Sequence, residues 1–232
     1  MKKIIVNAIK SLKFKFSKEK SFDDVYYEHL FIENPLWNKP FPNKEELLRW
    51  NIIKDFIETV ESNQKKMKIL DLGCGRGWLT HLLSKHGEVL GVEPVKEVFS
   101  HAKKLFPDIK FKCGTSKDLI MKYKNNFDLI VSSEVIEHIP DGEKVTFIKD
   151  IYKLLNKNGY LILTTPRKEV QKEWSLYTSP DQPVEDWLTE KEVEGLMLEE
   201  NFIVKKLERY GIPPISGASE ILVYQLWLFQ KK

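Results

Sequence analysis

Two short stretches of the sequence hold the residue types that chemistry needs. The first is Asp71-Leu-Gly-Cys-Gly-Arg-Gly77, in which an acid is followed by glycines at every second position. An apolar pair, Ile69-Leu70, precedes it and a helical pattern begins at Trp78, so we expect a strand, a glycine-rich turn and a helix start. Glycine tolerates positive φ and lets a ligand approach the backbone closely. The helix would aim its first amides at that ligand.

A further acid stands where a nucleoside would need one. Glu93 ends the apolar run 88–92, which reads as the next strand along the chain. A carboxylate at this place can accept hydrogen bonds from both hydroxyls of a ribose. The turn and the acid together predict a nucleoside-containing ligand. The glycine spacing is G-x-G-x-G, whereas NAD sites usually show G-x-G-x-x-G, so NAD is disfavoured.

The second chemical stretch is Glu134-Val-Ile-Glu-His138. In a helix, offsets of three and four would place Glu134, Glu137 and His138 on one face. His138 is a candidate general base because an imidazole titrates near neutral pH. The same three side chains could instead bind a divalent cation such as Mg²⁺. No histidine follows His138, so Gln182, Glu185 or Asp186 would have to complete that metal site. A third interpretation gives this helix only a structural or cofactor-orienting role.

The elements that must position these residues alternate between short apolar runs and helical patterns. This order predicts an α/β fold with a mostly parallel, doubly wound sheet. We expect a helix before the fifth strand to end at Gly159. The expected strands cover residues 68–72, 88–92, 109–112, 127–132, 160–165, 202–210 and 221–229. Because ligands bind beyond the carboxyl ends of parallel strands, we expect the two chemical stretches to meet at one rim.

The N-terminal part of the chain differs in composition from the rest. Residues 1–20 contain seven lysines interleaved with apolar residues, a pattern that allows contact with an anionic membrane surface or packing as an arm. Residues 21–43 are rich in aromatic residues and proline. Asn43 and Glu46 form a capping box for a following helix. We therefore predict a basic arm and a helical segment over residues 1–64 and a ligand-binding domain over 65–232.

Composition sets outer bounds on the function. The chain has 232 residues, 42% hydrophobic and 31% charged, and a net charge of +3, which is too small to indicate nucleic-acid binding. No apolar run approaches the roughly 18 residues of a membrane span, and no signal peptide is evident. The two cysteines, Cys74 and Cys113, are expected in the core and favour a reducing compartment, so we expect a cytoplasmic protein.

With these motifs the sequence resembles the class I S-adenosylmethionine (SAM) dependent methyltransferases, over roughly residues 65–210. The most similar group is the small-molecule enzymes that include the ubiquinone O-methyltransferases. The resemblance implies a Rossmann-like seven-stranded sheet with an antiparallel last strand, and SAM as cofactor. It also implies that the basic arm and helical segment over residues 1–64 form a lid over the active site. It departs from many relatives after the third strand, where Gly114-Thr115-Ser116 replaces an acid that would bond the adenine amino group. Val95 and Leu119 are candidates to cover the adenine.

The resemblance assigns roles to residues of this chain. Asp71 would lie near the SAM ammonium, Glu93 would hold the ribose, and His138 would act with Glu134 and Glu137 in catalysis. The expected cofactor-binding residues are Asp71, Gly73, Cys74, Gly75, Gly77, Glu93, Pro94, Thr115, Ser116 and Ser133. The expected substrate-binding residues are Tyr26, Tyr27, Arg167 and Gln182, two from the lid and two from a substrate loop over residues 166–190.

Several acceptors are compatible with these residues. The segment Gln182–Trp187 resembles one found in methyltransferases of surface-polysaccharide synthesis, so we expect a hydroxyl of a sugar or glycan precursor. A quinone or phenol hydroxyl is an alternative. A 2′-hydroxyl of RNA is a second alternative, although the evenly dispersed charges disfavour a nucleic-acid groove. A protein that binds SAM without catalysis is a third. The sequence does not indicate the oligomeric state.

Overall fold

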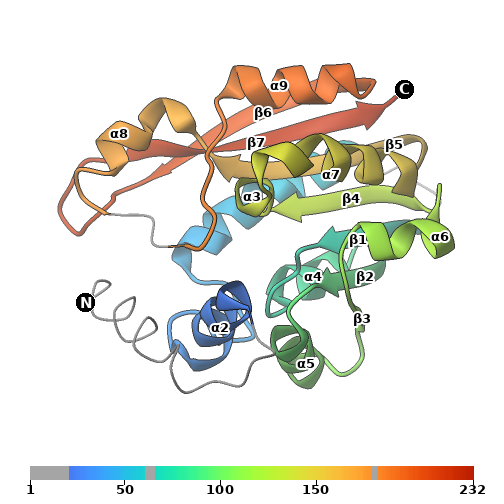
Figure 1. Cartoon of the computed structure of the whole chain (residues 1–232), viewed down its shortest axis with the longest axis horizontal. Coiled ribbons are helices and arrows are strands. Elements are labelled where there is room, and N and C mark those ends of the chain that lie inside the picture. The colour runs from blue at the N-terminus through green and yellow to red at the C-terminus, as the bar shows by residue number, and fades with distance from the viewer. Residues whose placement is uncertain (1–20, 61–65, 179–181) are drawn as a thin grey trace.

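The computed structural model describes residues 21–60, 66–178 and 182–232, and these residues build one mixed sheet flanked by helices (Figure 1). The strand order is β3-β2-β1-β4-β5-β7-β6. All neighbouring strands from β3 to β5 are parallel, and β7 is antiparallel to both β5 and β6. The predicted mostly parallel sheet with an antiparallel last strand is confirmed. The strands are β1 Met67–Leu72, β2 Gly87–Glu93, β3 Lys110–Cys113, β4 Phe127–Ser133, β5 Leu155–Pro166, β6 Phe202–Ile212 and β7 Ile221–Lys231.

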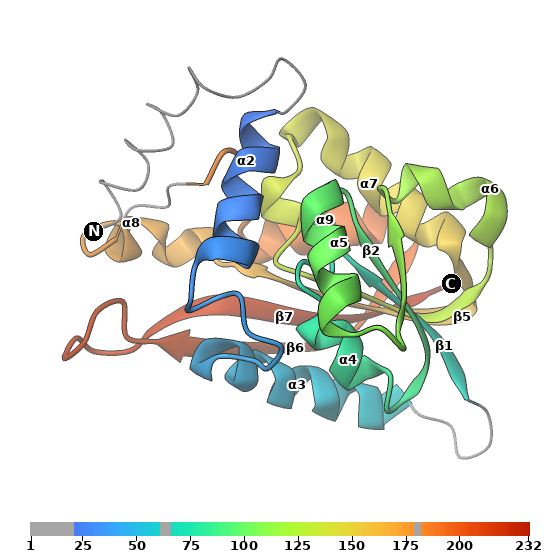
Figure 2. The same cartoon turned by 90° about the horizontal axis from the view of Figure 1, so that it is seen from below.

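Helices cover both faces of the sheet, as expected for a doubly wound fold (Figure 2). Side chains of α3 and α4 pack on one face, and side chains of α7 and α9 pack on the other. The α-helices are α2 Phe22–Glu28, α3 Lys44–Val60, α4 Trp78–Leu83, α5 Lys96–Leu105, α6 Ile120–Tyr123, α7 Asp141–Leu154, α8 Gln171–Trp174 and α9 Glu190–Glu199. A π-helix covers His29–Glu33, and 3₁₀ turns cover Lys117–Leu119, Ile136–His138 and Lys168–Val170.

The central strands are apolar because both of their faces are covered, which is typical of parallel sheets. In β1 every residue except Lys68 is buried, and Ile69 and Leu70 point to opposite faces. This burial fixes the carboxyl ends of β1, β2 and β4 at one edge, where Asp71, Glu93 and Ser133 stand.

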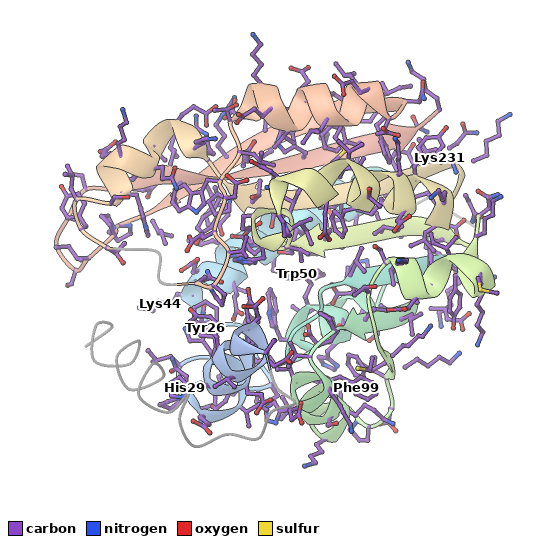
Figure 3. The ribbon with its side chains drawn as sticks, viewed as in Figure 1. Tyr26, His29, Lys44, Trp50, Phe99 and Lys231 are labelled. Carbon is purple, nitrogen blue, oxygen red and sulfur yellow. The ribbon has the colours of Figure 1, made fainter. Side chains whose placement is uncertain are left out.

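The predicted lid divides into two parts. The capping box is confirmed, since the Glu46 amide donates to Asn43 Oδ1 and the Asn43 amide donates to Glu46 Oε2. The helix that it starts, α3, is a core helix whose apolar residues pack beneath the sheet, including Trp50 (Figure 3). Of the described residues of the predicted lid, those of α2, the π-helix and the turn after them remain to cover the ligand side. Residues 1–20, with the predicted membrane-contacting arm, lie outside the described part of the chain.

Two local expectations were wrong. The helix before the fifth strand ends at Leu154, and residues 155–159 begin β5; the positive φ of 62° falls on Asn158, so Gly159 is not the helix stop. Cys113 is exposed at the end of β3, whereas Cys74 is buried, and both are free thiols. Among the described residues, no helix combines the length and the apolar character needed to cross a membrane.

Candidate active site

A cavity of about 830 Å³ opens at the carboxyl ends of β1, β2 and β4. It brings the two chemical stretches of the sequence together, as predicted. The predicted site residues that line it are Asp71, Gly73, Cys74, Gly75, Glu93, Pro94, Thr115, Ser116, Ser133, Glu134, Glu137, His138, Tyr26, Tyr27 and Gln182. Gly77 and Arg167 are not among the lining residues.

The backbone angles and the close contacts around each glycine explain why the turn is rich in glycine. Gly73, Gly75 and Gly77 have φ values of 80°, 51° and 86°. A Cβ on Gly73 would lie 2.4 Å from Val135 Cγ2, so a side chain does not fit there. A Cβ on Gly77 would lie 2.8 Å from Phe111 Cζ, so Gly77 is required by packing and not by contact with the cavity. The turn therefore presents bare backbone at residues 73 and 75.

Two buried carboxyl groups lie beside this turn. Glu93 accepts hydrogen bonds from the amides of Gly75 at 3.0 Å and Val95 at 2.9 Å. Asp71 accepts one from Thr80 Oγ1 at 2.5 Å. Burial raises the pKa of each carboxyl to about 7. A cationic ligand would favour their ionised forms, and free lone pairs on Glu93 could accept ribose hydroxyls. The bare turn and these acids fit SAM, which carries an ammonium, a sulfonium and a ribose.

The polar groups of the turn after β3 form hydrogen bonds with other protein groups. Asp118 Oδ2 accepts hydrogen bonds from the Thr115 amide at 2.8 Å and Thr115 Oγ1 at 2.9 Å. Ser116 Oγ donates to Asp150 Oδ2 at 3.3 Å. Of the two expected apolar residues, Val95 lines the cavity, whereas Leu119 is buried and is not among the lining residues. Because Thr115 Oγ1 donates its proton to Asp118, its oxygen lone pairs stay available to accept a hydrogen bond from an amino group.

The stretch 134–138 is not the helix that its spacing predicts. Glu134 has a left-handed backbone, with φ of 56°, and a short 3₁₀ turn follows at Ile136–His138. The reason is that the Glu134 amide continues the sheet by donating to Thr164 O at 3.0 Å. Thr164 Oγ1 also donates to Glu134 Oε1 at 2.7 Å, and Thr165 Oγ1 donates to Glu137 Oε2 at 3.0 Å. The two carboxyls are therefore bound to β5.

His138 is held in one protonation pattern. Its Nδ1 lies 2.7 Å from the carbonyl oxygen of Val184, which can only accept, so Nδ1 carries the proton and Nε2 keeps a lone pair. Burial lowers the pKa of the imidazole, which keeps the ring neutral. Glu137 Oε1 lies 3.8 Å from Nε2. The geometry suits a general base whose acting atom is Nε2.

The expectation of a metal site is not supported. Glu134, Glu137 and His138 point to three different partners, namely Thr164, Thr165 and Val184. In the described part of the chain, no group of three or more His, Cys, Asp or Glu side chains is arranged to hold a metal ion. These residues do not fit Mg²⁺.

A buried arginine is the main feature that sequence reasoning missed. Arg49 of α3 lines the cavity and donates from Nε to Tyr210 Oη at 3.1 Å and from Nη1 to Ser133 Oγ at 3.4 Å. Its Nη2 lies 3.6 Å from Glu45 Oε1 and 3.7 Å from Glu134 Oε2. One signal was available, since Arg49 shares the apolar face of α3 with Ile53 and Phe56.

The predicted substrate residues divide. Tyr27 stacks on Phe31 with ring centroids 6.2 Å apart and meets His138 edge-on at 6.0 Å, while Tyr26 lies beside it on α2 (Figure 3). Gln182 lines the cavity from the loop after α8. Arg167 has a structural role, because its Nε donates to Glu190 Oε1 at 2.7 Å and its Nη1 to Leu222 O at 2.8 Å. The structure therefore contradicts a substrate contact from Arg167.

The glycine turn on β1, the acid ending β2 and the antiparallel β7 define a class I SAM-binding fold. A family model described as a methyltransferase domain matches residues 63–210, which is more than half of the chain. The chain belongs to this family, among the class I SAM-dependent methyltransferases.

Named relatives lie in the same group. The chain is 35% identical over 136 residues to a ubiquinone biosynthesis O-methyltransferase of Pelagibacter ubique, covering 56% of this chain and 55% of the relative. It is 36% identical over 135 residues to the mitochondrial enzyme of that name from Bos taurus, covering 52% and 36%. The chain thus spans about half or less of the length of these two relatives.

Solved structures support the fold. The PH0226 protein of Pyrococcus horikoshii matches with a TM-score of 0.67 at 19% identity, covering 90% of this chain and 99% of that one. Magnesium protoporphyrin IX methyltransferase of Synechocystis, solved with bound SAM, matches with a TM-score of 0.64 at 11% identity, covering 93% and 100%.

Proposed function

We propose that this protein is a SAM-dependent O-methyltransferase that methylates an aromatic hydroxyl, of the phenol, catechol or hydroquinone type. The carrying observation is the His138 imidazole, with Nδ1 bound to Val184 and Nε2 available, beside the ring of Tyr27, which Tyr26 contacts in turn. The names of the curated relatives favour a quinone-type acceptor. Nothing in the comparisons supports the sugar acceptor that the sequence segment Gln182–Trp187 suggested.

Each residue then has a defined task. SAM, when bound, supplies a methyl group on a sulfonium, which needs no further activation. His138 Nε2 accepts the proton of the acceptor hydroxyl, which raises the nucleophilicity of the oxygen. The Val184 carbonyl fixes the tautomer, and the nearby Glu137 carboxyl favours the imidazolium that results. Tyr27 and Phe31 provide an apolar, aromatic cover that excludes water and packs against a planar ring.

The test replaces the base and leaves the cofactor site intact. His138→Gln should lower kcat by about 10²–10⁴ because it removes proton transfer. Its affinity for S-adenosylhomocysteine should stay near that of the wild type. Methyl transfer from radiolabelled SAM to 4-ethylcatechol and methylhydroquinone measures the first quantity, and calorimetry measures the second.

His81→Gln is the matched control, because His81 stacks on Phe106 away from the cavity and should keep full activity. Wild-type turnover in His138→Gln would remove the base from this proposal. An active enzyme that methylates only sugars or RNA in a wider acceptor screen would overturn the aromatic acceptor.

A further inference from the structure

The described lining of the cavity contains more acidic than basic residues, with eleven Asp or Glu against two Arg and one Lys. Burial raises the pKa of four of these acids, Asp71, Glu93, Glu134 and Glu137, to about 7 or 8, so near neutral pH the excess of negative charge comes mainly from the others. A cleft lined by one sign of charge concentrates the field and selects ligands of the opposite sign. The three cations are therefore the groups that decide whether an anionic acceptor could be held.

Both arginines are already committed to protein groups. Arg76 donates to both carboxylate oxygens of Glu46, at 2.7 and 2.6 Å, and to the carbonyls of Lys39 and Phe41. Arg49 bonds Tyr210 and Ser133 and lies between Glu45 and Glu134. An acceptor carboxylate or phosphate would have to compete with these partners.

The remaining cation, Lys117, lies far from the acceptor side of the cavity. It begins the 3₁₀ turn after β3, which is the edge strand, whereas the turn that contains His138 follows β4, on the other side of Glu93. Among the described lining residues, the acceptor side around His138 thus has no uncommitted Lys or Arg.

The same side carries acids and aromatic faces. Asp23 lies in the first turn of α2, and Glu185 lies in the loop that binds His138 through Val184. No described residue forms an ion pair with Asp23. Both acids are close enough to favour a raised pKa of His138, opposing its burial. Tyr26, Tyr27 and Trp174 line the same cavity, and aromatic faces attract cations.

We propose that the acceptor end discriminates by charge: it admits uncharged aromatic hydroxyl compounds, favours those with a cationic substituent, and rejects those with a carboxylate or phosphate. This inference rests on the proposed function for the place of the acceptor. It deepens that function by naming the charge class of the acceptor, which the aromatic lining alone does not decide.

Three catechols that share the ring and differ in charge provide the test: 4-(2-aminoethyl)catechol, 4-ethylcatechol and 3,4-dihydroxyphenylacetate. Binding is measured by calorimetry with S-adenosylhomocysteine present, and kcat/KM is measured with SAM. The cation should bind and react at least about 10-fold better than the anion, with the uncharged compound between them and the spread narrowing as salt rises. Equal or better use of the anion would overturn the inference.

Substitution then assigns the effect to named groups. Asp23→Asn with Glu185→Gln should reduce the cation-to-anion ratio several-fold, whereas Asp55→Asn, an exposed change on α3 outside the cavity, should leave it unchanged. An unchanged ratio in the double variant would also overturn the inference. A charge order in binding without methyl transfer to any of the three would instead overturn the proposed function, so the two failures are distinguishable.

Discussion

At the scale of single residues, the glycine-rich turn at residues 73–77 needs glycine because a side chain there would collide with neighbouring residues. Gly73 faces Val135, and Gly75 faces the ring of Phe31, whose Cζ would lie 3.2 Å from an added Cβ. Val135 belongs to the turn at residues 134–138, and Phe31 belongs to the aromatic cover that it forms with Tyr27. Both neighbours are far from the glycines in sequence, so the turn is where three parts of the chain meet.

Gly73→Ala should lower the free energy of unfolding by roughly 1–3 kcal/mol, because the residue combines a φ of 80° with a clash against Val135. It should also weaken S-adenosylhomocysteine binding, since Val135 or the turn must move. Urea unfolding and calorimetry measure the two effects.

Gly195→Ala is the control. Gly195 lies within α9, and an added Cβ would meet nothing within 4 Å, so the variant should gain about 0.5–1 kcal/mol and keep its cofactor affinity. If Gly73→Ala bound the cofactor as tightly as Gly195→Ala, the turn would not need bare backbone.

The places of Asp71 and Glu93 at the cavity were predictable from the sequence, because each lies near the carboxyl end of an apolar run that forms a strand. Their roles in holding the cofactor stay predictions. Arg49 did not follow in the same way, because its partners Tyr210 and Ser133 come from other strands. Arg167 failed for the related reason that Glu190, in a later helix, captures its guanidinium.

At the scale of elements, one buried ion pair joins the cofactor turn to α3. The side chains of Arg76 and Glu46 are 1% and 3% exposed, and Glu46 also closes the capping box of α3. The guanidinium further binds two carbonyls of the segment before α3. This pair therefore positions the aromatic cover relative to the glycine turn.

Glu46→Gln should lower the free energy of unfolding by about 3–5 kcal/mol, because it leaves the Arg76 charge buried without its counter-ion. Chemical denaturation measures the loss. Lys110→Ala removes one partner of the exposed pair with Glu88 and should change stability very little. Similar small losses in both variants would show that the buried pair is not a structural tie.

Strands were the most predictable elements, because burial on both faces leaves continuous apolar runs at β1, β2 and β4. The backbone of the turn at residues 134–138 was not predictable. Spacing of three and four favoured an α-helix, yet the Glu134 amide pairs with Thr164 thirty residues later and turns the backbone left-handed. Local spacing cannot report a hydrogen bond that depends on sheet order.

At the scale of the whole molecule, buried carboxyls link stability to pH. Burial raises the folded-state pKa of Asp71 and Glu93 to about 7, above the roughly 4 of an unfolded chain. Their contribution to stability is present at low pH and is lost as pH rises through 7. Cationic SAM favours the ionised carboxyls and so opposes this loss.

Without ligand, the temperature of the unfolding midpoint should therefore decrease as the pH rises from about 5 to about 7.5 and level off above that, and SAM should raise it more near pH 7.5 than near pH 5. Calorimetry in buffers of different ionisation enthalpy should detect protons released on SAM binding near pH 7. Asp71→Asn should reduce that release. A proton count of zero in the wild type would mean that SAM binding does not change the ionisation of these carboxyls.

The Arg76–Glu46 pair joins residues inside the family match to residues that precede it. The family match runs from residue 63 to 210, yet the described residues that accept hydrogen bonds from the Arg76 guanidinium, namely Lys39, Phe41 and Glu46, all precede residue 63. A polypeptide cut at those limits would keep the shared sequence and bury an uncompensated guanidinium, and it would also lack the strand that pairs with β5. The segment that the family model matches is thus smaller than the segment that this chain needs in order to fold.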